Sequence, residues 1–365
     1  MSLMSTSRDS SRLWSGLGAL APRRSVLAGP IVAAVTGATA LVATGASGLP
    51  LRDPDHVVGS RLLLVVVLAA VLVVVDIVVR ASLASGRLAI PSRTGLATVR
   101  RERWTGMRMA VVGSALLSFY VTYLAYRNLK SLVPVLRPRD LFDRQLAEAD
   151  RAMFAGNDPA QVLHDLLGTG IATQLFSSVY VVFLVFVPLS LALALVFSRD
   201  LRRGLFFATA LSINWALGAL SYYLLPALGP VYAGSRAFSD LPATAASELQ
   251  QVLLEDRLSF LRDPEAAGAA QGIAAFASLH VSIIFTAALA AHLIGLRSSI
   301  RAALWALLAV TSLATVHLGW HYVIDDVAGL FLGAAALTLA LGLTGYEPRS
   351  APALRTRTRA EAGTA

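Results

Sequence analysis

The chain has 365 residues, of which 56% are hydrophobic and 15% are charged, and its net charge is +9. Soluble domains carry about 25% charged residues, so this composition excludes an ordinary soluble protein and a disordered one. The lack of cysteine excludes disulfides, thiolate metal sites and cysteine nucleophiles.

Eight apolar runs follow one another along the chain, and a helix needs about 20 such residues to cross a membrane. We therefore predict an all-α, polytopic membrane bundle of about eight transmembrane helices. The first run is longer than the apolar core of a signal peptide, so we expect an uncleaved span. The runs are residues 26–49, 62–79, 109–126, 171–197, 204–228, 278–296, 302–318 and 323–343.

The connections between the runs fall into two sets that differ in charge. The first set carries 20 basic and 5 acidic residues, whereas the second carries 11 basic and 16 acidic ones when Asp325 and Asp326, at the start of the last run, are counted with it. Because basic connections stay in the cytoplasm, we expect a multi-pass plasma-membrane protein with both termini inside and the second set of connections facing the exterior. The first set comprises 1–25, 80–108, 198–203, 297–301 and the tail from 346, and the second comprises 50–61, 127–170, 229–271 and the turn before the last run.

The segment 139–170 lies on the predicted outer side and has a helical pattern. Phe142, Leu146, Ala149 and Met153 recur at spacings of 4, 3 and 4 among charged residues. This pattern predicts an amphipathic helix, which either lies at the outer membrane surface or packs on the outer loop.

The strongest candidate for chemistry lies at the outer junction of the last two runs, where His321 precedes Asp325 by four residues. On a helix the two side chains share a face, so the carboxylate can bind one imidazole nitrogen and leave the other as a nucleophile or base. A plainer alternative is a His–Asp pair that closes a helix end. His317 extends the stripe and would permit a metal, but zinc sites usually need a further ligand, and we predict none.

Two further elements lie on the same predicted face. Ser278 and His280 begin the sixth run, where helix N–H groups and a hydroxyl can bind phosphate and an imidazole can protonate a leaving oxygen. Lys130 and Arg137, at the outer end of the third run, suit phosphate oxygens. The plainer alternatives are a capping serine beside an interfacial histidine, and a cation pair that anchors to lipid headgroups.

These residues resemble the motifs of the type 2 phosphatidic acid phosphatase superfamily, which are Lys-x6-Arg-Pro, Pro-Ser-Gly-His and Ser-Arg-x5-His-x3-Asp. The segments Ala277-Ser278-Leu279-His280 and His321-Tyr322-x2-Asp325 are similar to its inositol phosphorylceramide synthase-like branch. The resemblance covers roughly residues 109–343. It implies a six-helix core (109–345, with the segment 139–170 and the loop 229–271), an added helix pair with a basic loop (26–108), and cytoplasmic tails (1–25 and 346–365).

The resemblance also implies a role for each matching residue. His321 would be the nucleophile that forms a phosphohistidine, and Asp325 would orient it. His280 would be the general acid, and Ser278 would bind phosphate. The family uses no metal or other cofactor.

The match departs from the family pattern at the phosphate-binding cations. Ala314-Thr315 stand where the third motif has Ser-Arg. The Lys130–Arg137 motif precedes two further runs instead of lying just before the second motif. Arg236, in the outer loop, is therefore a rival phosphate ligand.

We thus expect an enzyme that transfers the phosphoryl group of a membrane lipid, at the outer leaflet, to water or to a polyol or sugar hydroxyl. A lipid transporter and a non-catalytic scaffold are the alternatives. The polar residues cluster at the outer interface and not near the midplane, where transporter sites lie. No nucleic-acid partner is expected, and the oligomeric state is left open.

Overall fold

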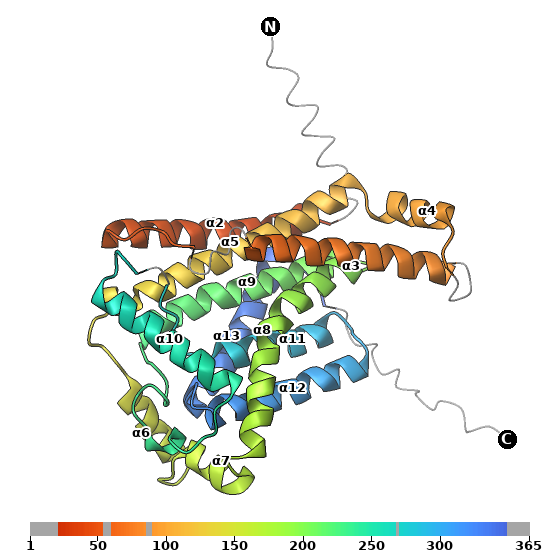
Figure 1. Cartoon of the computed structure of the whole chain (residues 1–365). Coiled ribbons are helices and arrows are strands. Elements are labelled where there is room, and N and C mark those ends of the chain that lie inside the picture. The colour runs from red at the N-terminus through yellow and green to blue at the C-terminus, as the bar shows by residue number, and fades with distance from the viewer. Residues whose placement is uncertain (1–20, 54–59, 85–89, 268–269, 349–365) are drawn as a thin grey trace, which may run out of the picture.

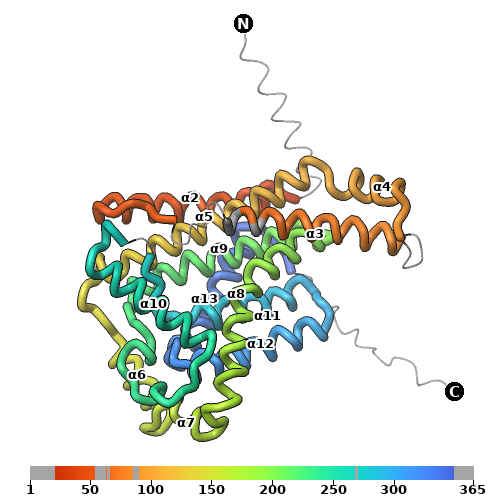
Figure 2. The backbone as a smooth tube through the Cα atoms, in the orientation of Figure 1, coloured from red at the N-terminus to blue at the C-terminus, as the bar shows by residue number. Residues whose placement is uncertain are grey.

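The computed structural model describes residues 21–53, 60–84, 90–267 and 270–348, which form α-helices and one short 3-10 helix and contain no strand (Figures 1 and 2). The all-α prediction is therefore confirmed. Each of the eight apolar runs falls mostly within a helix, and seven of these helices are long and apolar enough to cross a membrane. They are α2 (Arg23–Ser47), α3 (Ser60–Ala84), α5 (Gly106–Leu136), α8 (Ile171–Phe197), α9 (Leu201–Leu224), α12 (Ser298–His317) and α13 (Val323–Thr344).

The eighth run forms α11 (Leu279–Leu293), a shorter apolar helix of 15 residues. The predicted tails 1–25 and 346–365 lie mostly outside the described residues. The remaining elements connect the spans and are α4 (Arg93–Arg103), α6 (Asp143–Met153), α7 (Pro159–Leu167), η1 (Arg236–Phe238) and α10 (Ala245–Arg262).

The connecting helices separate to opposite ends of the bundle. In Figure 1, α6, α7 and α10 gather at one end, whereas α4 and the turn from α11 to α12 lie at the other. These are the two sets of connections that the charge pattern distinguished. The arrangement is that of a multi-pass membrane protein with two chemically different ends.

Helix α9 is buried along most of its length and lies at the centre of the largest apolar core. It packs against α2, α5, α8, α11 and α13. Helix α2 is part of this core because it packs along α5, and the Ser25 hydroxyl donates to the Thr344 carbonyl at 2.8 Å. Much of α3, in contrast, is exposed, as expected of a helix in contact with lipid.

A close contact between α11 and α13 determines where the polar residues meet. A Cβ atom at Gly329 would lie 2.5 Å from the carbonyl oxygen of Ser278, so only glycine permits this approach. Small residues serve in this way where membrane helices pack closely. The start of α11 is thereby held against the first turns of α13.

Candidate active site

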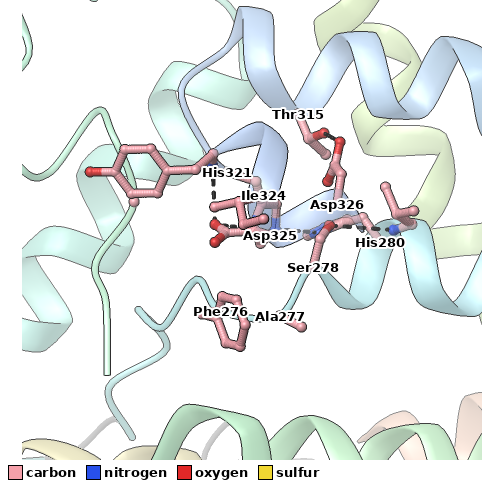
Figure 3. Close-up of polar contacts among 12 residues, drawn as sticks. Phe276, Ala277, Ser278, His280, Thr315, His321, Ile324, Asp325 and Asp326 are labelled. Carbon is pink, nitrogen blue, oxygen red and sulfur yellow. Dashed lines mark hydrogen bonds and ion pairs between the residues drawn. The ribbon is translucent and has the colours of Figure 1, made fainter. Parts of the chain in front are cut away.

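Three segments from distant parts of the chain build the candidate site, which Figure 3 shows in close-up. The Ser278 hydroxyl caps α11 by accepting from the Val281 N–H at 3.4 Å, and the Ser278 N–H donates to the Asp325 carbonyl at 3.0 Å. On the α9 side, the Ser221 hydroxyl accepts from the Ala277 N–H at 3.0 Å. The segment before α11 is therefore fixed to both neighbouring helices.

The two histidines and the carboxylate form a continuous line. The Nδ1 of His280 lies 3.2 Å from the Nε2 of His321, and the Nδ1 of His321 lies 3.4 Å from Oδ2 of Asp325. A proton on Nδ1 of His321 satisfies the carboxylate and leaves the lone pair on Nε2. The residues that sequence analysis selected as base, acid and orienting group are therefore in contact.

The local structure around His321 differs from the expected shared helix face. His321 lies in the loop before α13, Tyr322 is the N-cap, and Asp325 is in the first helical turn. Asp325 reaches backwards because it also accepts from the Tyr322 N–H at 3.0 Å, as in a capping box. The four-residue spacing places the two side chains in contact through this cap and not through a helical stripe.

Electrostatics keep His321 unprotonated. Burial foremost, and then the positive charge of Lys130, lower the pKa of His321 to about 3. Only 5% of the residue is exposed. A neutral imidazole with a free lone pair is the reactive form of a histidine nucleophile.

Asp326, which the sequence analysis did not select, is a buried member of the site. Its Oδ2 accepts from the Thr315 hydroxyl at 3.1 Å. Ser278 itself is fully buried. The hydroxyl expected to bind phosphate thus caps α11, while the Ser278 N–H joins the start of α11 to α13.

His317 does not extend the stripe of His321 and Asp325. Its Nε2 lies 2.9 Å from the Thr173 hydroxyl, and its ring packs against the ring of His164 at 4.5 Å. The carbonyl of His317 is in turn 2.9 Å from Nε2 of His164. These contacts join α7 and α8 to α12, which is a structural role.

A cavity of about 590 Å³ lies between α6, the loop after α9 and the loop before α13, and His321 is part of its wall. Its polar lining mixes guanidinium groups with carboxylates and one phenol. Such a lining offers donors to a phosphate and acceptors to hydroxyl groups. The polar and charged lining residues include Arg144, Arg151, Arg236, Asp143, Asp150, Asp158 and Tyr322.

Two buried carboxylates on α6 hold this cavity together, and sequence analysis missed both. Asp143 accepts from the N–H groups of Leu228 and Gly229 at 2.9–3.0 Å and from the Tyr322 hydroxyl at 3.3 Å. Asp150 accepts from the N–H groups of Val323 and Ile324 at 2.8 and 3.0 Å, so it caps α13.

Helix α6 therefore packs on the loops, and the predicted helix 139–170 is two helices joined by a turn. Asp143 and Asp150 flank the buried Leu146 at helical spacings of 3 and 4. This spacing was the signal available in the sequence.

The predicted cation pair is divided between two places. The Nζ of Lys130 lies 4.8 Å from the ring centre of Tyr222, and its charge acts on His321. Arg137 instead pairs with Asp140 at 2.8 Å, donates to the Tyr223 carbonyl and lines a second cavity. Arg236 lines the same cavity as His321.

Comparison with known proteins identifies one family. A model described as the PAP2 superfamily matches residues 144–339, more than half of the chain. No curated protein and no solved structure matches. The matched range contains Arg236, Ser278, His280, His321 and Asp325, and it begins after Lys130 and Arg137.

Proposed function

The chain belongs to the PAP2 superfamily, and on this premise we propose that it is a membrane phosphotransferase or phosphatase that acts on a lipid phosphate ester or phosphodiester. The observation that carries the proposal is the contact line from His280 through His321 to Asp325, beside a cavity of about 590 Å³. Membership of the superfamily indicates a phosphatase-type enzyme. The lipid substrate, the outer leaflet and the intermediate are parts of the proposal.

In the first half-reaction, Nε2 of His321 attacks the phosphorus in line with the leaving oxygen. A bond forms between nitrogen and phosphorus while the bond from phosphorus to the leaving oxygen breaks, and His280 gives that oxygen its proton. Asp325 accepts the Nδ1–H of His321 and stabilises the positive charge of the phosphorylated ring. Arg236 and Lys130 supply positive charge for the phosphate oxygens.

In the second half-reaction, an acceptor hydroxyl gives its proton to His280 and attacks phosphorus, and the nitrogen–phosphorus bond breaks. Water as acceptor gives hydrolysis, and a polyol or sugar hydroxyl gives transfer. The burial of His321 supports transfer, because a phosphohistidine shielded from water survives until a bound acceptor reaches it. The motifs similar to the inositol phosphorylceramide synthase-like branch support the same choice.

Trapping of the intermediate tests the proposal. The purified full chain in detergent is mixed with a ³²P-labelled lipid phosphate and quenched in alkali, in which a phosphohistidine is stable. We expect one label per active chain, its loss after mild acid, and no label in His321→Gln. An equally labelled His321→Gln protein would overturn the mechanism.

The products then distinguish transfer from hydrolysis. Phosphate release and lipid product are followed together, with and without an added polyol. In vesicles, movement of intact lipid across the bilayer without cleavage of any phosphate bond would instead support a transporter.

A further inference from the structure

A second cavity, of about 240 Å³, lies beside the catalytic cavity at the same end of the bundle. It is enclosed by the end of α5, the segment that follows it, the loop after α9 and helix α10. Leu141 and Leu228 line both cavities and form the wall between them. Neither catalytic histidine lines the second cavity, so it is a separate compartment.

One part of the cavity wall is lined by basic side chains and the other part by apolar ones. Arg137, Arg139 and Arg257 supply three guanidinium groups from two separate segments. The apolar part includes Val133, Pro134, Leu261 and Ile273. Such a division suits an amphiphile that carries an anionic group next to a hydrocarbon chain.

The positive charge in this cavity exceeds the negative charge that faces it. Asp140 neutralises Arg137 at 2.8 Å, but no described carboxylate forms an ion pair with Arg139 or Arg257. Burial lowers the pKa of Arg257, although the charge of Asp143 acts in the opposite direction. NH1 of Arg257 donates to Oε1 of Gln271 at 3.2 Å, so the protein supplies a hydrogen-bond acceptor to only part of this guanidinium group.

The backbone conformation of Arg139 also supports a ligand site in this cavity. Arg139 has φ of 71°, in the left-handed region that favours glycine. Non-glycine residues keep such a conformation where the surrounding structure enforces it, and they cluster at ligand sites.

We propose that this second cavity binds the phosphate of an anionic membrane lipid beside the catalytic cavity. Guanidinium groups bind phosphate through paired hydrogen bonds, and Arg139 and Arg257 are the two that lack an ion-pair partner among the described residues. The apolar lining from the last turns of α5 and α10 would contact the first carbons of the lipid chains. The site is distinct from the one at which phosphorus would be attacked.

Lipid retention by the full chain tests the proposal. The protein is reconstituted in nanodiscs of phosphatidylcholine that contain a small fraction of phosphatidylglycerol, and the retained lipids are counted by native mass spectrometry. We expect the wild type to retain phosphatidylglycerol with an apparent affinity at least about tenfold higher than Arg257→Gln or Arg139→Gln. Arg262→Gln, an exposed change on the same helix as Arg257, is the matched control and should retain lipid as the wild type does.

Several outcomes would overturn the lipid site. These are wild-type retention by both cavity variants, and an equal loss in the Arg262→Gln control. A third is displacement of the retained lipid by millimolar inorganic phosphate, with phosphate then bound to the protein in its place. The site would in that case bind free phosphate and not a lipid. The exposed Arg139 keeps the test informative if Arg257→Gln folds poorly. The same retention by a His321→Gln protein would separate this site from the catalytic proposal, since lipid binding needs no turnover.

Discussion

The Nδ1 of His280 lies 3.2 Å from the Nε2 of His321, so each ring occupies the space that a phosphate would need beside the other. A phosphorus atom bonded to His321 cannot fit within this separation. Under the proposed mechanism, a bound substrate would therefore part the two rings and break the hydrogen bond between them. The parted rings would then flank the phosphate on the attacking and leaving sides.

Leaving-group chemistry can distinguish the roles of the two histidines. His280→Gln should lower kcat/KM for an alkyl lipid phosphate by about two to four orders of magnitude. With a nitrophenyl ester, whose leaving oxygen needs no proton, the loss should be much smaller, whereas His321→Gln should abolish both activities. Initial rates with the two substrates measure this difference. His292→Gln, at the other end of α11, is the control and should behave as the wild type.

Asp325→Asn tests the orienting carboxylate. The Tyr322 N–H and Nδ1 of His321 both contact Oδ2 of Asp325, so the single oxygen of asparagine can keep both contacts, but it lacks the negative charge that would stabilise the phosphorylated ring. We expect kcat to fall by about two to four orders of magnitude, with a small change in thermal midpoint. The matched control is Asp165→Asn, which makes the same substitution at an exposed position on α7 and should leave kcat unchanged. Wild-type turnover in Asp325→Asn would contradict the orienting role.

Asp150 should affect both stability and turnover. Asp150→Ala removes the cap of α13 and should cost about 1–2 kcal/mol in the free energy of unfolding. It should also lower kcat, because His321 directly precedes the capped turn. Asp200→Ala, which removes a cap of α9 at the other end of the bundle, should lower stability without lowering kcat. Recovery of kcat in Asp150→Asn would support positioning, and equal kcat losses in both alanine variants would argue against it.

The low pKa of His321 predicts acid sensitivity of folding. The unfolded chain binds a proton at this histidine below about pH 6.5, whereas the folded chain does so only near pH 3. Stability therefore decreases as the pH falls from about 6.5 towards 3 and is constant for this group above that range. The thermal midpoint of His321→Gln should decline less between pH 7.5 and 4.5 than that of the wild type. Parallel curves for the two proteins would show that another group controls the decline.

Single neutralisations can identify the cations that act on phosphate. Lys130→Met should raise the pKa of His321, so the acidic limb of kcat/KM should move to higher pH. Arg236→Gln should raise KM by about tenfold without moving that limb, because Arg236 lines the cavity beside His321. Arg137→Gln, whose side chain is already paired with Asp140, is the comparison with little expected effect. Loss of activity in Arg236→Gln alone would reject the assignment of Lys130.

The helical bundle could be predicted because long apolar runs permit only one structure in a membrane. Backbone groups cannot remain unpaired in hydrocarbon, so such runs must become helices. The run 171–197 coincides with α8, and the others differ from their helices mainly at the ends. The end of α5 extends ten residues beyond its predicted limit, and Lys130 can lie in this extension because the neighbouring helix α9 supplies the ring of Tyr222.

The candidate site could be predicted only in part. Chemical types and short spacings pointed to His280, His321 and Asp325, since these features are local in sequence. The roles of Asp143, Asp150 and Asp326 depend on backbone N–H groups and hydroxyls from remote segments, which no spacing reveals. Lys130 and Arg137 are separated for a similar reason. Helix α5 ends at Leu136, so Arg137 lies in the segment after the helix and lines the second cavity, away from Lys130.

The brevity of α11 has a consequence for how a lipid would arrive. Fifteen residues rise only about 22 Å, less than the roughly 30 Å of hydrocarbon in a bilayer. With one end of α11 level with its neighbours, the end that carries His280 is sunk beneath the polar surface. The headgroup of a lipid would then enter the site from the side while its tails stay among those of other lipids, so the lipid would not have to leave the bilayer to react.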